Sequence, residues 1–149
     1  MLDKIFCVDD DLITLMLCKK VIERALSTKE IHTAQNGEEA IQYFKALAEK
    51  YKIDKNTIYP KLTFLDLNMP IMNGWEFLDI YSALGYHEIF KDAKFIVLSS
   101  TIDPQDVNKT KNYSVVIDFL SKPITKEMLE NLKVYLSRDL EIPFFSFPT

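Results

Sequence analysis

Short apolar runs alternate with longer amphipathic segments along the whole chain. The apolar runs predict strands at residues 4–8, 62–65, 95–98 and 117–120, and residues 30–34 predict a short second strand. Between these runs, apolar residues recur every three or four positions, which predicts helices. Regular alternation of strands and helices is typical of a mainly parallel sheet that carries helices on both faces.

Apolar spacing and end signals together predict the helices at residues 12–26, 37–47, 75–84, 104–111 and 126–136. In the first helix we expect one buried face, formed by Leu12, Leu15, Met16, Ile22 and Leu26. Asn36 and Glu39 have the spacing of a capping box at the start of the second helix. The polar segment 48–60 predicts a frayed helix end followed by a surface loop.

The order of strands in such a sheet is restricted by the right-handedness of the crossover connections. A doubly wound sheet of five parallel strands in the order 2-1-3-4-5 satisfies this rule, and gives a flavodoxin-like, three-layer α/β sandwich. In this order the first and third strands are neighbours at the switch point of the topology. Ligands of open α/β sheets bind at this point, beyond the carboxyl ends of the strands.

Composition excludes several classes of protein. The 149 residues are 48% hydrophobic and 27% charged, which is ordinary for a folded domain. A net charge of −4 argues against a nucleic-acid surface, and no apolar run approaches the length of a membrane span or a signal peptide. Cys7 and Cys18 lack metal-site spacing and fit reduced thiols. We therefore expect a cytoplasmic protein without membrane insertion.

Candidate chemistry is concentrated at the carboxyl ends of the predicted strands. The first strand ends in Asp9 and Asp10, the third in Asp66, the fourth in Ser99 and the fifth in Lys122. Three carboxylates about 4 Å apart repel one another by ~4 kcal/mol per pair at an effective dielectric constant of 20. Such a cluster needs a cation, and a small set of oxygen ligands favours Mg²⁺.

A Mg²⁺ site with a nearby ammonium and hydroxyl group is suited to holding a phosphoryl group, whose charge is spread over three oxygens. Lys122 and Ser99 supply those two groups. Asp66 is the candidate nucleophile because it lies on the central strand, and carboxylates form aspartyl phosphates in known enzymes. The backbone carbonyl of Asn68 is well placed to complete the metal shell.

The pattern resembles the receiver domain of two-component response regulators, a CheY-like fold. The matching motifs are Val8-Asp9-Asp10, Leu65-Asp66-Leu67-Asn68-Met69-Pro70 with Gly74, Val97-Leu98-Ser99 and Phe119-Leu120-Ser121-Lys122-Pro123. Each motif alone is weak, but together they occur in the right order at the right strand ends. The resemblance extends from about residue 2 to residue 136.

This resemblance implies a role for each residue of the cluster. Asp66 would accept a phosphoryl group from the phosphohistidine of a sensor kinase or a phosphotransfer protein. Mg²⁺ would be bound directly by Asp10, Asp66 and the Asn68 carbonyl, and by Asp9 through water. Lys122 would bind the phosphoryl oxygens.

The resemblance also implies a switch and two modulating positions. Ser99 and Phe119 would be the switch residues, and the Lys122–Pro123 peptide would be cis. Asn68 and Thr101 flank the approach of the attacking water and would affect the lifetime of the phosphoryl group. The chain would then be a signalling switch that catalyses only its own phosphorylation and dephosphorylation.

Domain organisation follows from the extent of the resemblance. We expect a receiver domain over residues 1–137 and a tail over 138–149 without an effector domain. Such a protein would not bind DNA directly and would act on an unknown downstream protein. A homodimer would form through one of two surfaces. One is the face formed by residues 104–111, 117–120 and 126–136, and the other is the Phe-rich tail, which contains Phe144, Phe145 and Phe147.

Three other functions compete with a phosphorylated receiver. A phosphate-independent interaction module on a receiver fold usually lacks one of the acidic residues or the lysine, and all are present here. A Mg²⁺-dependent phosphatase of the haloacid-dehalogenase type needs a second Asp two residues after the nucleophile, where this chain has Asn68. A flavin-binding protein of flavodoxin type needs a Ser/Thr/Gly-rich phosphate loop after the first strand, which is absent from the sequence.

Overall fold

Five parallel strands form the central sheet in the order β2-β1-β3-β4-β5, as the sequence predicts. The computed structural model describes residues 2–139. The strands are β1 (Leu2–Val8), β2 (Thr28–Ala34), β3 (Leu62–Asp66), β4 (Lys94–Ser99) and β5 (Val116–Ser121). From β1 the chain continues to β2 on one side of the sheet, and from β3 it continues to β4 on the other side. The switch point of the topology therefore lies between β1 and β3.

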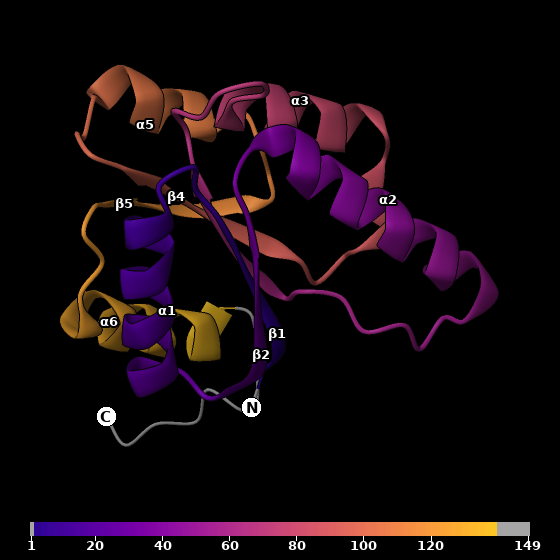
Figure 1. Ribbon diagram of the computed structural model, residues 1–149, viewed down its shortest axis with the longest axis horizontal. Helices are drawn as coiled ribbons and strands as arrows, with labels where there is room; N and C mark the ends of the chain where they lie inside the picture. The colour runs from indigo at the N-terminus through magenta and orange to yellow at the C-terminus, as the bar shows by residue number, and fades with distance from the viewer. Residues whose placement is uncertain (1, 140–149) are drawn as a thin grey trace.

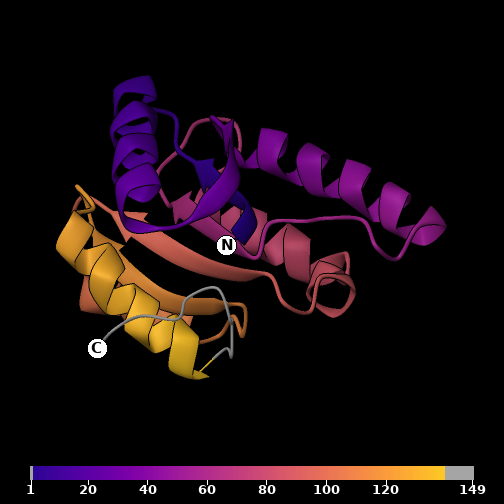
Figure 2. The same ribbon diagram turned by 90° about the horizontal axis from the view of Figure 1, so that it is seen from below.

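Helices cover both faces of this sheet (Figures 1 and 2). They are α1 (Leu12–Ala25), α2 (Gly37–Ile53), α3 (Gly74–Ala83), the single turn α4 (Tyr86–Ile89), α5 (Pro104–Thr110) and α6 (Lys126–Asp139). α1 and α6 pack on one face, whereas α2, α3 and α5 lie on the other. The helix predicted to begin at residue 104 is thus α5, and the last predicted helix is α6.

Side-chain alternation along the strands builds two separate cores. In β1, Ile5 and Cys7 point into the core under α1 and α6, while Phe6 and Val8 point into the core under α2 and α3. Successive residues of a strand face opposite sides of the sheet, so one buried strand serves both layers. The core under α2 and α3 is rich in aromatic rings that meet around Phe44.

The helix that starts at Gly37 is longer than the sequence predicts. It continues through residue 53, so that the surface loop starts only at Asp54, whereas we expected a frayed end from residue 48. Ala48 is buried and Tyr51 contacts Phe90 edge to face, which anchors the last two turns. The polar residues of this segment occupy the solvent side of a helix, so their number does not indicate a loop.

The buried face of α1 also differs from the prediction. The buried residues are Leu15, Cys18, Ile22 and Ala25, whereas Leu12 and Met16 are 61% and 53% exposed. Apolar residues occur on more than one side of the first turns of this helix. Periodicity alone could not show which side packs against the sheet.

The helix α4 was not predicted, because its single turn is too short to show an apolar period. It follows Gly85, whose φ of 73° is a conformation that favours glycine. Tyr86 and Phe90 are buried at its two ends. The Phe-rich tail lies outside the described residues. None of the helices between residues 2 and 139 has the length and apolarity needed to cross a membrane.

Candidate functional site

Three carboxylates meet at the switch point of the sheet. Asp9 follows β1 directly and Asp66 is the last residue of β3, and the parallel register of the two strands brings them together. Asp9, Asp10 and Asp66 each present a carboxylate oxygen within 4.8 Å of the others. Asp9 and Asp66 are buried, with 3% and 4% exposure, whereas Asp10 is open to solvent. The structure therefore brings together the acidic residues that the sequence predicts.

The loop after β1 holds Asp9 in place. The backbone N–H of Asp11 donates a hydrogen bond of 2.9 Å to Asp9 Oδ1. The carboxylate of Asp11 caps α1 by accepting from the N–H of Ile13 at 2.9 Å. One short turn thus ends β1, orients a buried carboxylate and starts the next helix.

Lys122 supplies the positive charge of the cluster. Its Nζ lies 2.5 Å from Asp9 Oδ2 and 3.1 Å from Asp66 Oδ1, and its side chain is 18% exposed. The N–H of Lys122 donates to the carbonyl of Ser99 at 2.8 Å, which ties the end of β5 to the end of β4. The peptide bond between Lys122 and Pro123 is cis. The ammonium therefore bridges both buried carboxylates.

Burial and charge shift the pKa values of this cluster in opposite directions. Burial raises the pKa of Asp66 to about 6, and the neighbouring charge of Asp9 adds to the effect. Lys122 and the N–H of Asn68 oppose this shift. Burial alone would lower the pKa of Lys122, but its contacts with Asp9 and Asp66 raise it. Negative charge is thus in excess at the site, and the lysine stays charged.

In the loop after Asp66, the backbone of Gly74 lies close to the backbone of Asp66 and Leu67. The N–H of Gly74 donates to the carbonyl of Leu67 at 2.9 Å, and a Cβ at Gly74 would lie 2.6 Å from the carbonyl oxygen of Asp66. The N–H of Asn68 donates to Asp66 Oδ1 at 3.4 Å. The loop includes Ile71 at a φ of 68°, which is rare for a β-branched residue. Such conformations concentrate at functional sites.

Ser99 is buried at the end of β4, in the strand next to Asp66. Its Oγ accepts a hydrogen bond of 3.4 Å from the N–H of Thr101, which is itself exposed. Phe119 is half-buried in β5. It lines a cavity of about 400 Å³ between α5 and β5, with Ile102 and Val107 on the other side.

The donor set fits a hard divalent cation. Three carboxylates face a single ammonium at this point of the described chain, and oxygen ligands of this kind suit Mg²⁺ or Mn²⁺. The exposed position of Asp10 leaves room for the water molecules that Mg²⁺ retains. A bound cation would also relieve the repulsion that raises the pKa of Asp66.

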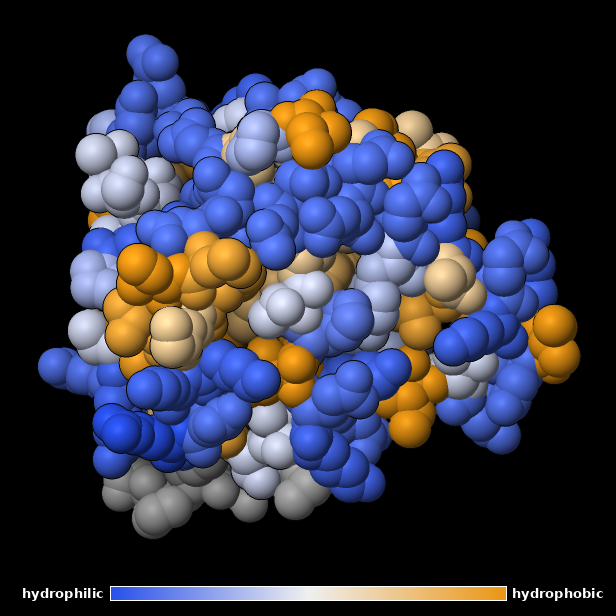
Figure 3. Space-filling view, viewed as in Figure 1, coloured by the Kyte–Doolittle hydropathy of each residue, from blue (hydrophilic) through white to orange (hydrophobic). Residues whose placement is uncertain are grey.

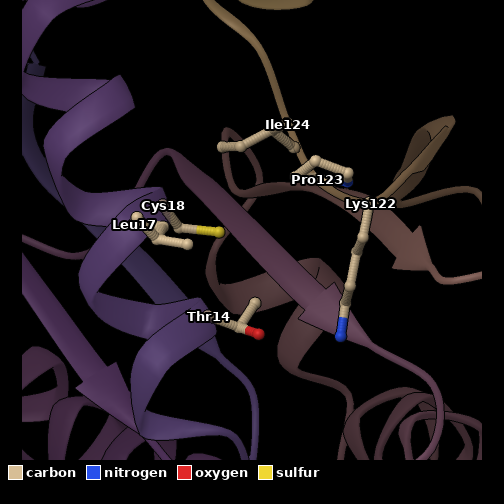
Figure 4. Close-up of a pocket in the computed structure, with 6 residues that line it drawn as sticks. All are labelled: Thr14, Leu17, Cys18, Lys122, Pro123 and Ile124. Carbon is tan, nitrogen blue, oxygen red and sulfur yellow. The ribbon is translucent and has the colours of Figure 1, made fainter.

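The sequence did not predict the cavity that lies beside Lys122. It has a volume of about 240 Å³ and lies between α1 and the connection from β5 to α6 (Figure 4). Its lining residues are Thr14, Leu17, Cys18, Lys122, Pro123 and Ile124. The one available signal was the surplus of apolar residues in the first turns of α1.

Comparison with known families and sequences agrees with this geometry. The family model of the response regulator receiver domain matches residues 5–133. The two-component response regulator ARR3 of Arabidopsis thaliana is 21% identical over 138 residues, which are 93% of this chain and 57% of that protein. The chain therefore spans somewhat more than half the length of this curated relative.

Solved structures show the same fold. A two-component response regulator from Cytophaga hutchinsonii is 28% identical with a TM-score of 0.79, covering 93% of this chain and 98% of the other. One from Legionella pneumophila is 26% identical with a TM-score of 0.69, covering 92% and 98%. The Mn²⁺-bound form of response regulator Rcp1 is 22% identical with a TM-score of 0.64, covering 99% of each chain. This chain belongs to the response regulator receiver domain family of two-component signalling proteins.

Proposed function

We propose that Asp66 accepts a phosphoryl group from the phosphohistidine of a sensor kinase or a histidine phosphotransfer protein. The observation that supports this most directly is the position of Lys122 Nζ, 3.1 Å from Asp66 Oδ1 at the carboxyl edge of the sheet. An ammonium beside a candidate nucleophile is placed to bind the oxygens of an incoming phosphoryl group.

In the reaction, an oxygen of Asp66 attacks the phosphorus atom and the bond from phosphorus to the donor nitrogen breaks. The leaving imidazole takes up a proton from solvent. Lys122 turns from the carboxylates to a phosphoryl oxygen, which keeps the ammonium paired throughout. The attacking carboxylate must be ionised, and Lys122 and the N–H of Asn68 both favour the ionised form of Asp66.

Mg²⁺ would be held by Asp10, Asp66 and the backbone carbonyl of Asn68, with Asp9 bound through water. When bound, the cation would supply positive charge to the phosphoryl oxygens in the transition state. The related response regulator Rcp1 has been solved in a Mn²⁺-bound form, which supports a divalent cation as a ligand of this chain.

Phosphorylation would shift the equilibrium between two conformations of the protein, which differ in how side chains pack at the carboxyl edge of the sheet. Ser99 would turn its hydroxyl to the phosphoryl group, and Phe119 would leave the cavity between α5 and β5. The surface of α5, β5 and α6 would then bind a downstream protein or a second copy of the chain. Asn68 and Thr101 would set the phosphoryl lifetime, and the buried free thiols of Cys7 and Cys18 support a cytoplasmic location.

The test is the reaction of the pure protein with acetyl phosphate, followed on a gel that retards phosphoproteins. We expect a retarded band with Mg²⁺, no band with EDTA, and no band for Asp66→Asn. Asp92→Asn is the matched control, because Asp92 is an exposed carboxylate outside the cluster and should leave the band unchanged. A folded wild-type protein that gives no band and does not bind beryllofluoride would instead be a phosphate-independent interaction module.

A further inference from the structure

Gly37 begins α2 with a close contact to the loop between β3 and α3. Its N–H is one of the first amides of the helix, which have no partner within the helix itself. This N–H donates a hydrogen bond of 2.8 Å to the carbonyl of Met72. A Cβ at Gly37 would lie 2.7 Å from the carbonyl oxygen of Met72 and 2.7 Å from Met72 Cγ. Only glycine therefore fits this contact without a shift of one of the two segments.

Backbone conformation gives no other reason for a glycine at this position. Gly37 is helical, where alanine is the more stable residue, and the glycine with a positive φ is Gly85. Glu38 and Glu39 follow Gly37 and are exposed, and Figure 3 shows hydrophilic side chains over this end of α2. Gly37 is buried, in contrast to these neighbours. The glycine is therefore explained by its contact with the loop.

The loop makes a tight turn directly before this contact. The N–H of Met72 donates to the carbonyl of Pro70 at 2.7 Å, which closes a three-residue γ-turn. Its central residue is Ile71, whose φ of 68° is strained for a β-branched side chain. The side chain of Ile71 is 78% exposed, so its own packing does not hold the turn. A strained backbone persists where its surroundings fix it, and the hydrogen bond from Gly37 to Met72 supplies such a constraint.

Asn68 lies between two fixed points of this loop. At the first point, the carbonyl of Leu67 accepts a hydrogen bond of 2.9 Å from the N–H of Gly74. At the second point, the carbonyl of Met72 accepts from Gly37. Asn68 is one residue away from the first point and four residues away from the second. A shift of Met72 is therefore transmitted to the backbone of Asn68 through a short segment.

We propose that Gly37 is a positioning residue that makes the acidic site selective for Mg²⁺ over the larger Ca²⁺. The proposal rests on the proposed function, in which the carbonyl of Asn68 is a Mg²⁺ ligand. Mg²⁺ requires near-ideal octahedral geometry with ligands at about 2.0–2.1 Å, whereas Ca²⁺ accepts irregular geometry at about 2.3–2.6 Å. A carbonyl that the loop holds in place favours the ion with the stricter geometry.

The test compares the dissociation constants of Mg²⁺ and Ca²⁺, measured by titration calorimetry on the full chain without a phosphodonor. In Gly37→Ala, the added methyl group displaces the carbonyl of Met72 and loosens the loop. We expect Mg²⁺ binding to weaken by about tenfold, as happens when a group that orients a metal ligand is removed. Ca²⁺ binding should change by less than about twofold, because Ca²⁺ tolerates a displaced ligand.

The matched control is Ala48→Gly in the same helix. Ala48 is buried and lies eleven residues after Gly37, which is about 16 Å along the helix axis. This variant lowers the stability of α2 without touching the loop, so both cations should bind as they do in the wild type. Unchanged Mg²⁺ binding in Gly37→Ala would overturn the proposal. Equal weakening of Mg²⁺ and Ca²⁺ binding would overturn it as well, because selectivity would then be unaffected.

Two variants of Ile71 test the turn without any change in α2. Ile71→Gly suits the positive φ and should keep the Mg²⁺ dissociation constant within about twofold of the wild-type value. Ile71→Pro fixes φ near −65°, which is incompatible with the turn, and should weaken Mg²⁺ binding by about tenfold. The side chain is exposed, so neither variant removes core packing. Equal Mg²⁺ affinities of the two variants would overturn the proposal.

A metal-free measurement separates this proposal from the proposed function. In EDTA, amide hydrogen exchange of residues 67–73 should be about tenfold faster in Gly37→Ala than in the wild type, and unchanged in Ala48→Gly. A wild-type protein that prefers Mg²⁺ but does not react with acetyl phosphate would contradict phosphoryl acceptance by Asp66 and leave the role of Gly37 intact. A phosphorylated wild type, together with normal exchange and normal Mg²⁺ affinity in Gly37→Ala, would contradict the role of Gly37 alone.

Discussion

At the scale of residues, the site is a set of buried charges that do not balance. Asp9 and Asp66 are almost fully buried, Asp10 lies beside them, and Lys122 is the one ammonium that the described chain brings within 4 Å of Asp9 and Asp66. Burying carboxylates costs free energy unless they are paired. The excess of negative charge therefore destabilises the site. A bound cation or phosphorylation of Asp66 would change this balance of charge.

The variant Asp66→Asn should stabilise the metal-free protein near neutral pH. The pKa of Asp66 is about 6 in the folded state and 3.8 in the unfolded state, so the folded state loses stability as pH rises through this range. We expect the free energy of unfolding of Asp66→Asn to exceed that of the wild type by ~1–3 kcal/mol at pH 7 and by little at pH 4. Urea unfolding in EDTA at both pH values measures this difference.

The control for that comparison is Asp92→Asn, which removes an exposed carboxylate paired with Lys61. It should change the free energy of unfolding by less than about 1 kcal/mol at either pH. If Asp66→Asn is no more stable than the wild type at pH 7, the carboxylate is not destabilised by its surroundings as we describe.

The variant Lys122→Met should destabilise the metal-free protein. Removing the ammonium leaves Asp9 and Asp66 buried without a counter-charge, and breaking a buried ion pair in this way costs about 2–4 kcal/mol. Mg²⁺ should restore part of the loss. Thermal unfolding with and without Mg²⁺ measures both effects, and Lys29→Met, which removes an exposed pair with Asp3, should cost less than about 1 kcal/mol.

At the scale of elements, the loop between β3 and α3 positions Asp66 through Gly74. A Cβ at Gly74 would lie 2.6 Å from the carbonyl oxygen of Asp66 and 2.9 Å from the Cα of Leu67, and both are backbone atoms that cannot rotate away. Gly74→Ala should therefore cost about 2–3 kcal/mol of stability and slow phosphorylation of Asp66. The matched control is Gly85→Asn, at a position with a φ of 73° and open space around it, where the cost should stay below about 1 kcal/mol.

Unfolding free energies and acetyl phosphate reactivity of these two variants check the role of the loop. A Gly74→Ala protein with wild-type stability and reactivity would mean that the close approach of the two segments has no influence on Asp66.

The single tryptophan reports on the movement of α5. Lys109 Nζ of α5 lies 4.4 Å from the ring centroid of Trp75 in α3, and the ring of Tyr113 stacks beside Trp75 at 6.0 Å. Tyr113 is held in turn by a hydrogen bond of 2.6 Å from its hydroxyl to Asp79. If phosphorylation shifts α5, the cation leaves the ring and the emission of Trp75 changes.

We expect beryllofluoride to change Trp75 emission in the wild type, and to change it less in Lys109→Ala, which lacks the cation. Asp66→Asn should show no change at all. An unchanged spectrum in a wild-type protein that binds beryllofluoride, as shown by a raised melting temperature, would argue that α5 stays in place.

At the scale of the whole molecule, the sheet and the carboxylates were predictable from the sequence for one shared reason. Parallel strands all end at the same edge, so residues that follow short apolar runs must meet there. Asp9 and Asp66 could be paired because β1 and β3 are neighbours in the predicted order 2-1-3-4-5, which right-handed crossovers allow. The positions of Lys122 and Ser99 follow from the same argument.

Other features could not be predicted, because they depend on packing between distant segments. Tyr51 continues α2 past residue 48 through a contact with Phe90, which periodicity cannot show. Leu12 and Met16 have helical spacing but face solvent, because Leu15 and Cys18 occupy the sheet side of α1. The cavity beside Lys122 likewise exists only after α1 and the segment before α6 meet.

The most direct test of phosphoryl acceptance is chemical mapping of the modified residue. The protein is treated with acetyl phosphate and Mg²⁺, the acyl phosphate is reduced with borohydride, and peptides are sequenced by mass spectrometry. We predict that Asp66 alone is converted to homoserine, and that EDTA abolishes the conversion. Conversion of Asp9 or Asp10 in place of Asp66, or no conversion in a protein that is phosphorylated, would contradict the assignment.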